Sequence, residues 1–276
     1  MKFTKTKTLL TILLTLVMML GLVGCGSDKG SEQAAKGDKW VIAINSTFPP
    51  FETVKEGTSD YQGIDIDLAK ALAKKMHKDV QFVDMKFASL VPTLQSGRAD
   101  LIISAISPTD ERLQVLDFSK PYYFPMKAII CKKGANFDAL DKLKGHKAGA
   151  SMGTTFAKDL KAVGGIDVVE LDTTPLVVQD IKNGRLAGGL FDSSQAAVFI
   201  KQHQDLEMHI IQAPVLYADT FAIAMPKGSQ DKAKIDQLLQ EMRANGELQK
   251  ILEEHLGADA AKQYAAAIAD LDIAKM

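Results

Sequence analysis

Short runs rich in valine and isoleucine alternate with longer amphipathic stretches from residue 40 onward. This alternation is typical of an α/β protein with mainly parallel strands, because each helix connects two strands and covers a face of their sheet. Strands are predicted at 40–44, 80–83, 101–104, 128–131, 147–150, 168–171, 188–191 and 209–212, with 217–225 extended again. Helices are predicted at 65–76 with Asp65 as the cap, at 87–96, after a Thr109 cap, and at 154–162, 175–182, 194–202, 232–245, 247–255 and 258–267.

Two parts of the chain repeat one design. A helix that ends at Gly97 leads into a short buried strand, and a helix that ends at Gly184 does the same further along. The far end of each strand carries a polar residue, Ser104 in the first unit and Asp192 in the second. Ligands of open α/β sheets bind beyond the carboxyl ends of the strands. We therefore expect Ser104 and Asp192 to present polar groups from two lobes to one ligand.

The N-terminal segment has the pattern of a lipoprotein leader. Lysines at positions 2, 5 and 7 precede an uncharged apolar stretch at 9–23. This stretch is too short for a comfortable bilayer span and ends at small residues, which favours a signal peptide over a transmembrane helix. Leu22-Val23-Gly24-Cys25 has the form of a lipobox, which is cleaved before a lipid-modified cysteine. Residues 1–25 are therefore predicted to be a signal peptide, with Cys25 as the lipidation site.

The next segment, 26–38, is predicted to be a flexible tether. It is rich in glycine, serine and charged residues and has no apolar run, so it cannot bury enough surface to fold. We therefore expect the folded part to lie on the extracellular or periplasmic side of the cell membrane, held there by the lipid.

Composition excludes several classes of function. The net charge is −1 and the basic residues are scattered, so neither nucleic acid nor an electrostatic membrane patch is indicated. After the leader, Cys131 is the only cysteine; it cannot form an intramolecular disulfide and is predicted to be buried in a strand. No cofactor or metal site is predicted, because no paired ligand spacing occurs among the histidines, His77, His146, His203, His209 and His255.

Four motifs stand in order along the chain: Pro49-Pro50-Phe51-Glu52; Gly63-Ile64-Asp65-Ile66-Asp67-Leu68; Ser107-Pro108-Thr109-Asp110-Glu111-Arg112 followed by Asp117-Phe118-Ser119-Lys120-Pro121-Tyr122-Tyr123; and Leu143-Lys144-Gly145 before Gly153-Thr154-Thr155. With these motifs, residues 40–256 resemble the polar amino-acid binding proteins of bacterial ABC importers, the extracellular solute-binding family 3. The resemblance implies a two-lobed, type II periplasmic-binding-protein-like fold, with crossing strands near 125–128 and 217–221. The first lobe would comprise 39–126 and 221–276, and the second 127–220.

A free amino acid carries a carboxylate and an ammonium on one carbon, so its binder needs a fixed cation and a fixed anion. The resemblance implies that Arg112 binds the α-carboxylate through two parallel hydrogen bonds, which a lysine could not reproduce. Backbone amides near Ser107 and near Thr155, at the start of the helix that opens at 154, would complete this cage. Asp192 would bind the ammonium, together with the Ser107 hydroxyl and a main-chain carbonyl near Ala105.

The ligand side chain would lie between two aromatic rings. The resemblance places Phe48 and Phe87 at these positions, where packing and cation-π attraction contribute about 0.5–2 kcal/mol per good contact. It also places four further residues in the side-chain pocket, with Glu52 as an acceptor near its mouth: Asn45, Glu52, Ser104 and Ser151. Relatives that bind cationic amino acids often have an acid where Asn45 stands, whereas the Ser-Pro-Thr run at 107–109 is closer to arginine binders. Arginine or a related polar amino acid is therefore favoured.

The predicted function is to bind this amino acid by hinge closure and to deliver it, as a monomer, to the permease of an ABC importer. Two alternatives stay open. A few proteins of this fold are dehydratases of arogenate or prephenate, which need a general acid in the cleft. The residues at 193–195 are Ser-Ser-Gln and supply none, so a non-enzyme is favoured. The other alternative is a sensor that reports the ligand to a membrane kinase.

Overall fold

The computed structural model describes residues 39–212 and 216–269. The predicted signal peptide at 1–25 with Cys25, and the tether at 26–38, lie outside the described residues. From Lys39 onward the described residues belong to one compact unit. No helix within them is both long enough and apolar enough to cross a bilayer.

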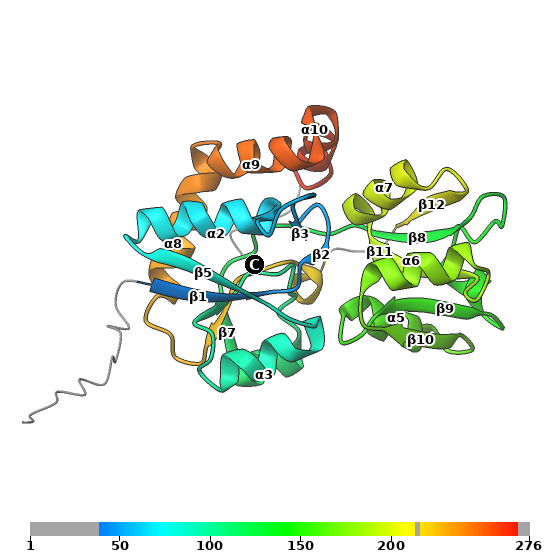
Figure 1. The fold of residues 1–276 in the computed structure, drawn as a ribbon, viewed down its shortest axis with the longest axis horizontal. Helices are drawn as coiled ribbons and strands as arrows, with labels where there is room; N and C mark the ends of the chain where they lie inside the picture. The colour runs from blue at the N-terminus through cyan, green and yellow to red at the C-terminus, as the bar shows by residue number, and fades with distance from the viewer. Residues whose placement is uncertain (1–38, 213–215, 270–276) are drawn as a thin grey trace, which may run out of the picture. The chain divides into compact units, whose positions relative to one another are not determined.

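The first sheet contains strands from both ends of the folded chain, in the order β5 (Asp79–Asp84), β1 (Lys39–Ile44), β6 (Leu101–Ile102), β13 (Ala224–Pro226) and β7 (Leu116–Phe118). β1 runs parallel to β5 and β6, and β13 runs antiparallel to β6 and β7. The helices that accompany this sheet are α2 (Ile64–Lys75), α3 (Leu90–Gln95), α4 (Asp110–Val115), α8 (Lys232–Ala244), α9 (Glu247–Leu256) and α10 (Ala258–Ala267) (Figure 1). Residues such as Ile42, Ile44 and Leu72 are fully buried beneath them.

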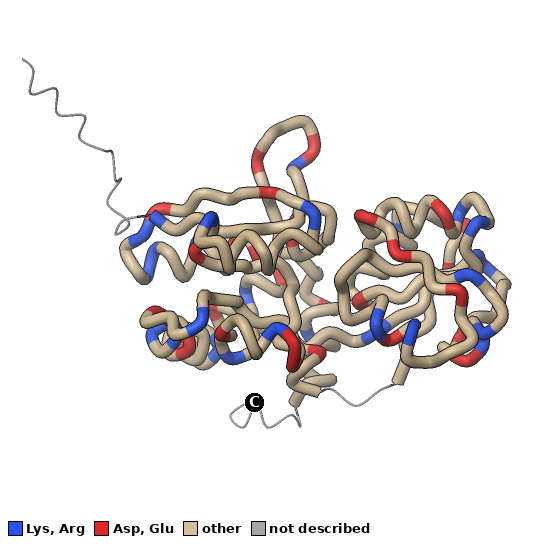
Figure 2. The backbone as a smooth tube through the Cα atoms, turned by 90° about the horizontal axis from the view of Figure 1, so that it is seen from below, with Lys and Arg blue, Asp and Glu red and all other residues tan. Residues whose placement is uncertain are grey.

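The second sheet is built from one continuous stretch, in the order β10 (Asp167–Leu171), β9 (Lys147–Ser151), β11 (Gly188–Asp192), β8 (Lys127–Lys132) and β12 (Leu206–Ile211). Three helices pack on it: α5 (Thr155–Val163), α6 (Thr174–Lys182) and α7 (Ser193–Gln202) (Figure 1). β8 pairs antiparallel with both β11 and β12. Charged residues are spread over both sheets and their helices, without a basic stripe (Figure 2).

Two passages of chain link the sheets, one between β7 and β8 and the other between β12 and β13. Tyr123 in the first passage and Phe221 in the second form an antiparallel bridge. Nearby, the Nζ atom of Lys127 lies 3.0 Å from Asp219 and 2.9 Å from Asp159, which ties both passages to α5. The architecture is therefore the two-lobed α/β fold that the resemblance implies. The exact lobe boundaries, 39–126 with 221–276 and 127–220, remain a prediction.

Local sequence signals located most elements within one or two residues, and the predicted Thr109 cap of α4 is confirmed. Thr154, expected as the first residue of its helix, is instead the cap of α5, where its side-chain oxygen accepts a backbone N–H. The Asp65 cap is wrong: Gly63 precedes α2, and Asp65 is fully buried with its Oδ2 2.6 Å from the Ala105 N–H.

Three further expectations need correction. The segment 217–225 is not extended throughout, because Tyr217–Asp219 forms a 3-10 turn. The helix at 87–96 begins with a 3-10 turn, Phe87–Ser89. The sheets are more mixed than expected, since β8 and β13 run against their neighbours. A small third sheet of β2 (Thr47–Phe48), β3 (Glu52–Val54) and β4 (Tyr61–Gln62), and a 3-10 turn at Leu140–Leu143, were not predicted.

Candidate ligand-binding site

A small cavity lies where residues of the two lobes meet. Its volume is about 10 Å³, close to the space of a single water molecule. The residues that line it are Phe48, Phe87, Ser104, Ala105, Ser107, Arg112, Thr154, Thr155, Phe156 and Phe221. The structure therefore brings together most of the predicted ligand contacts from distant parts of the chain. None of these ten is a carboxylate, histidine or cysteine, so this lining offers no side chain that commonly binds a transition metal.

Arg112 is a partly buried cation at the edge of the cavity. Its Nη1 donates to the Ser107 carbonyl at 2.8 Å and its Nη2 to the Gly153 carbonyl at 2.9 Å, so the guanidinium contacts both lobes. Burial lowers the pKa of Arg112 to about 10, and it therefore stays charged at neutral pH. Arg112 forms no salt bridge with any described residue, and the adjacent Glu111 pairs with Lys158 instead. A ligand carboxylate would supply the missing negative charge.

The start of α5 faces the cavity beside Arg112. The Thr154 side chain accepts the Ala157 N–H at 3.3 Å and donates to the Ser151 carbonyl at 2.6 Å. Thr155 is the first residue of the helix, so its own N–H has no acceptor within the helix. The positive end of the helix dipole adds to the favourable potential for an anion here. Ser151 itself ends β9 and is not part of the cavity lining.

Ser104 and Ala105 are held in place by a buried polar network. The Ser104 hydroxyl donates to Glu52 Oε1 at 2.5 Å and accepts the Asn45 N–H at 3.0 Å. Ala105 has a φ of +43°, which is unusual for a residue with a side chain. Its N–H is held by Asp65 Oδ2, and this contact helps to fix the backbone in that conformation.

Glu52 does not lie where it was expected. It is fully buried, so it is not at the mouth of a pocket, and it reaches the cavity only through Ser104. Burial raises the pKa of Glu52 well above its ordinary value, and the neighbouring Asp65 acts in the same direction. Burial raises the pKa of Asp65 as well. Two buried carboxyls in contact favour a shared proton, and we interpret the pair as support for Ser104 and Ala105.

Asn45 is also outside the cavity lining. Its Nδ2 donates to the Met85 carbonyl at 2.7 Å, and its Oδ1 accepts the Thr47 hydroxyl at 2.7 Å. Both ends of the amide are therefore already hydrogen-bonded within the first lobe. Its predicted contact with the ligand, like those of Glu52 and Ser151, stays a prediction.

Asp192 ends β11 and is the N-cap of α7. Its Oδ1 accepts the N–H groups of Ser194 at 2.9 Å and Gln195 at 3.0 Å. Its Oδ2 is buried and has no hydrogen-bond partner among the described residues. Burial raises the pKa of Asp192 to about 7, although the N–H groups of the cap lower it. Asp192 does not line the cavity, so its predicted contact with a ligand ammonium is not yet made in this arrangement.

Aromatic rings form one side of the cavity. The guanidinium carbon of Arg112 lies 5.4 Å from the centre of the Phe87 ring. Phe48 packs against Phe51 at 5.6 Å and against Phe221 at 6.3 Å between ring centres. Phe221 in turn stacks on Tyr123 at 5.6 Å, and the Tyr123 hydroxyl lies 2.6 Å from the Ser194 hydroxyl at the start of α7. This chain of rings lies between the cavity and the helix that Asp192 caps.

Phe156 and Phe221 line the cavity but were not predicted as contacts. Phe221 is the last residue of the segment that was expected to cross between lobes, so its place at the junction could have been inferred. Phe156 is the second residue of α5 and carries no signal beyond its place next to Thr155.

Further contacts join the two lobes near the cavity. The Thr174 hydroxyl donates to the Thr47 carbonyl at 2.6 Å, and both residues are shielded from solvent. Lys86 and Asp172 form an ion pair at 2.6 Å, with both side chains largely exposed. These contacts can form only when the two lobes are close together, so they stabilise the closed arrangement.

Comparisons with known proteins agree with the two-lobed fold. The family model for bacterial extracellular solute-binding proteins, family 3, matches residues 40–258. The arginine-binding extracellular protein ArtP of Bacillus subtilis (strain 168) is 33% identical over 89% of this chain and 96% of its own length. A probable histidine-binding protein of Neisseria gonorrhoeae is 30% identical over 87% of this chain and 92% of its own. The structure of AbpA from Streptococcus pneumoniae, an amino acid ABC transporter substrate-binding protein bound to L-arginine, is similar with a TM-score of 0.75 at 33% identity, covering 82% of this chain and 98% of that one.

Proposed function

Because the chain belongs to the bacterial extracellular solute-binding proteins, family 3, we propose that it binds free arginine, or a closely related polar amino acid, between its two lobes and delivers it to an ABC importer. The observation that carries this proposal is the partly buried Arg112 guanidinium in the cavity lining, which has main-chain acceptors but forms no salt bridge with a described residue. A desolvated charge without an ion-pair partner is unfavourable, and the carboxylate common to all amino acids would complete the site.

The other half of the zwitterion would be bound by Asp192. Its Oδ2 is a buried acceptor without a partner in the described part of the chain. An ammonium group would supply both a positive charge and donors to this oxygen. The rings of Phe221 and Tyr123 lie between Asp192 and the cavity. For the ammonium to contact Asp192, these two rings must move when the ligand enters.

The choice of arginine rests on the relatives and on the rings. Similar proteins include the arginine-binding protein ArtP and AbpA, whose structure contains L-arginine. In this chain, Phe48 and Phe87 would pack on the aliphatic stem or the guanidinium of an arginine side chain. Phe87 already contacts one guanidinium, that of Arg112.

Hinge motion would admit the ligand. A cavity of about 10 Å³ cannot hold an amino acid, so the lobes must separate for entry and close again around the ligand. The contacts between Thr174 and Thr47 and between Lys86 and Asp172 would then favour the closed form. The importer permease would recognise that closed form.

We also propose where the protein is located and that it does not catalyse a reaction. The chain would be a monomeric lipoprotein, cleaved before Cys25 so that residues 1–24 are removed, and Cys25 would carry the lipid that holds it on the outer side of the cell membrane. It would not be an enzyme: a dehydratase of this fold would need an acid in the cavity, and none of the ten lining residues is Asp or Glu.

A thermal-shift screen of the twenty amino acids on the full-length protein tests the function. A ligand that binds only the folded state raises the melting temperature, and arginine is expected to give the largest increase. The absence of a shift with every amino acid would overturn the proposal. Incubation with prephenate and arogenate is the matching control, because turnover that is lost on changing a cavity residue would establish the enzyme instead.

A further inference from the structure

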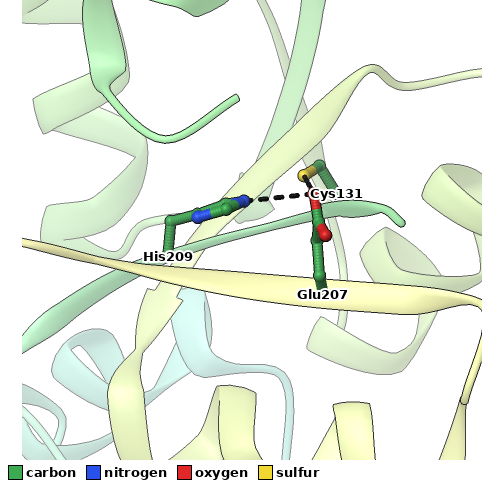
Figure 3. A group of neighbouring side chains, drawn as sticks. All are labelled: Cys131, Glu207 and His209. Atoms are coloured by element: carbon green, nitrogen blue, oxygen red, sulfur yellow. Dashed lines mark hydrogen bonds and ion pairs between the residues drawn. The ribbon is translucent and has the colours of Figure 1, made fainter. Parts of the chain in front are cut away.

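Three side chains with metal-binding chemistry meet at one edge of the second sheet. β8 and β12 pair antiparallel, with Cys131 directly opposite Glu207. His209 lies two residues beyond Glu207, so it projects from the same face of the strand. The His209 ring and the Cys131 sulfur both point toward the Glu207 carboxylate (Figure 3). None of the three lines the amino-acid cavity.

The distances suit a single metal ion. His209 Nε2 lies 3.2 Å from Glu207 Oε1, and Cys131 Sγ lies 3.7 Å from the same oxygen. The three ligand atoms all lie within 4.8 Å of one another. Tetrahedral zinc, with bonds of about 2.0–2.3 Å, holds its ligand atoms about 3.3–3.7 Å apart. The sulfur–oxygen separation of 3.7 Å lies within this range, and the nitrogen–oxygen separation of 3.2 Å is just below it, so small side-chain adjustments would admit a zinc ion.

The charges at this cluster also favour a cation. The Glu207 carboxylate lies 3.7 Å from the Cys131 sulfur. A divalent ion between them would stabilise a thiolate and a carboxylate side by side and would be neutralised by them. The thiol proton would pass to solvent as the sulfur–metal bond forms.

The support of the Glu207 carboxylate and the exposure of the three side chains are also typical of a metal-binding site. The Glu207 carboxylate accepts the Gly134 N–H, which helps to fix its orientation. Cys131 is fully buried, whereas the side chains of Glu207 and His209 are 25% and 29% exposed. The cluster is therefore closed behind the sulfur and open on the solvent side, where an ion could enter and a water could take the fourth position.

We propose that Cys131, Glu207 and His209 form a binding site for a divalent transition-metal ion of the zinc class, with water as the fourth ligand. The ion would join β8 to β12 and stabilise the second lobe. Cys131 lies four residues from Lys127, the residue at the start of β8 that pairs with Asp219 of the second linking passage and with Asp159 of α5, a separation of about 13 Å along the strand. Metal binding is thus separate from the amino-acid cavity, and this inference does not rest on the proposed function.

Titration of metal-free, full-length protein with Zn²⁺ in competition with a chromophoric chelator tests the site. One equivalent is expected to bind with a dissociation constant below about 1 μM, as expected of a three-ligand site. With Co²⁺ as the probe, a thiolate-to-cobalt charge-transfer band is expected, and Cys131→Ser should abolish it. His209→Gln should weaken Zn²⁺ binding at least about tenfold.

The matched control is His146→Gln, a histidine of the same lobe that contacts Phe137 instead of the cluster. It should leave the affinity for Zn²⁺ unchanged. Absence of the cobalt band in the wild type, or an equal loss of affinity in the control, would overturn the site. Circular dichroism will show whether Cys131→Ser folds. If it does not, His209→Gln still tests the site, because His209 is partly exposed and its substitution should not disrupt the fold.

Discussion

Arg112 and Asp192 both lie at the start of a helix, but Arg112 is partly exposed and reaches the cavity, whereas Asp192 is buried and does not. Arg112 lines the cavity and contacts main-chain oxygens of both lobes. Asp192 is fully buried, uses one oxygen to cap α7, and lies outside the cavity lining. Neither forms a salt bridge within residues 39–212 and 216–269.

This difference indicates an order of binding. The carboxylate site of the first lobe is formed by a short helix and its cap, and the Arg112 guanidinium already lines the cavity. The ammonium site of the second lobe must be uncovered as Phe221 and Tyr123 adjust. We infer that the ligand contacts Arg112 first and Asp192 during closure.

Arg112→Ala is expected to have the largest effect. Removing one partner of a buried, hydrogen-bonded charge pair costs about 2–5 kcal/mol, so affinity should fall at least about 30-fold for every amino acid that binds. Isothermal calorimetry measures the loss. Arg98→Ala, an exposed arginine in a turn of the same lobe, is the control and should bind like the wild type. Tight binding by Arg112→Ala would contradict the assigned role.

Asp192→Asn should change the pH dependence. Because burial raises the pKa of Asp192 to about 7, the free protein gains a proton there below pH 7 and must lose it to bind an ammonium. Arginine affinity should therefore fall by up to about tenfold per unit below pH 7 and level off above it. The asparagine variant should bind more weakly and lack this slope. An unchanged slope would place the titration elsewhere.

The stability of the ligand-free protein should depend on pH in the opposite sense. A carboxyl with a raised pKa stabilises the fold most fully below its ordinary pKa of 3.8, and this contribution is lost as pH rises toward 7. The difference in unfolding free energy between the wild type and Asp192→Asn should follow that trend in urea titrations. A difference that stays constant from pH 4 to 7 would show that Asp192 is not buried in solution.

The contacts between lobes should have smaller effects. Thr174→Val removes the buried hydrogen bond to Thr47 and should weaken arginine binding about fivefold, or about 1 kcal/mol. Lys86→Ala removes an exposed ion pair and should change affinity about twofold or less. Calorimetry on both variants checks the ranking. Because Gln195 also donates to the Thr174 hydroxyl, thermal unfolding should be measured alongside. A larger effect for Lys86→Ala would contradict the assignment of closure to the buried contact.

Much of the fold could be predicted because its signals are local. The strand β9, the helix α10 and the cap at Thr109 all follow from periodicity and capping chemistry within a few residues. The expected cap at Asp65 failed because its carboxylate bonds instead to Ala105, forty residues away. A contact of that length leaves no trace in local spacing.

In the candidate site too, residues marked by local motifs were predicted, whereas features that depend on long-range contacts were not. Arg112, Ser107 and Thr155 were predicted and lie together in the lining. Glu52 was misplaced because burial depends on the small sheet around it, which was not predicted. The cluster of Cys131 with His209 escaped notice because it depends on the pairing of β8 with β12.

The central claim is that Arg112 binds the α-carboxylate of the ligand. Agmatine, which is arginine without its carboxylate, provides the most direct test of this claim. Affinities for arginine and agmatine should be measured on the wild type and on Arg112→Ala, at protein concentrations that reveal millimolar binding. We predict that the wild type prefers arginine at least about 30-fold and that the variant largely loses this preference. A variant that prefers arginine as strongly as the wild type does would contradict the claim.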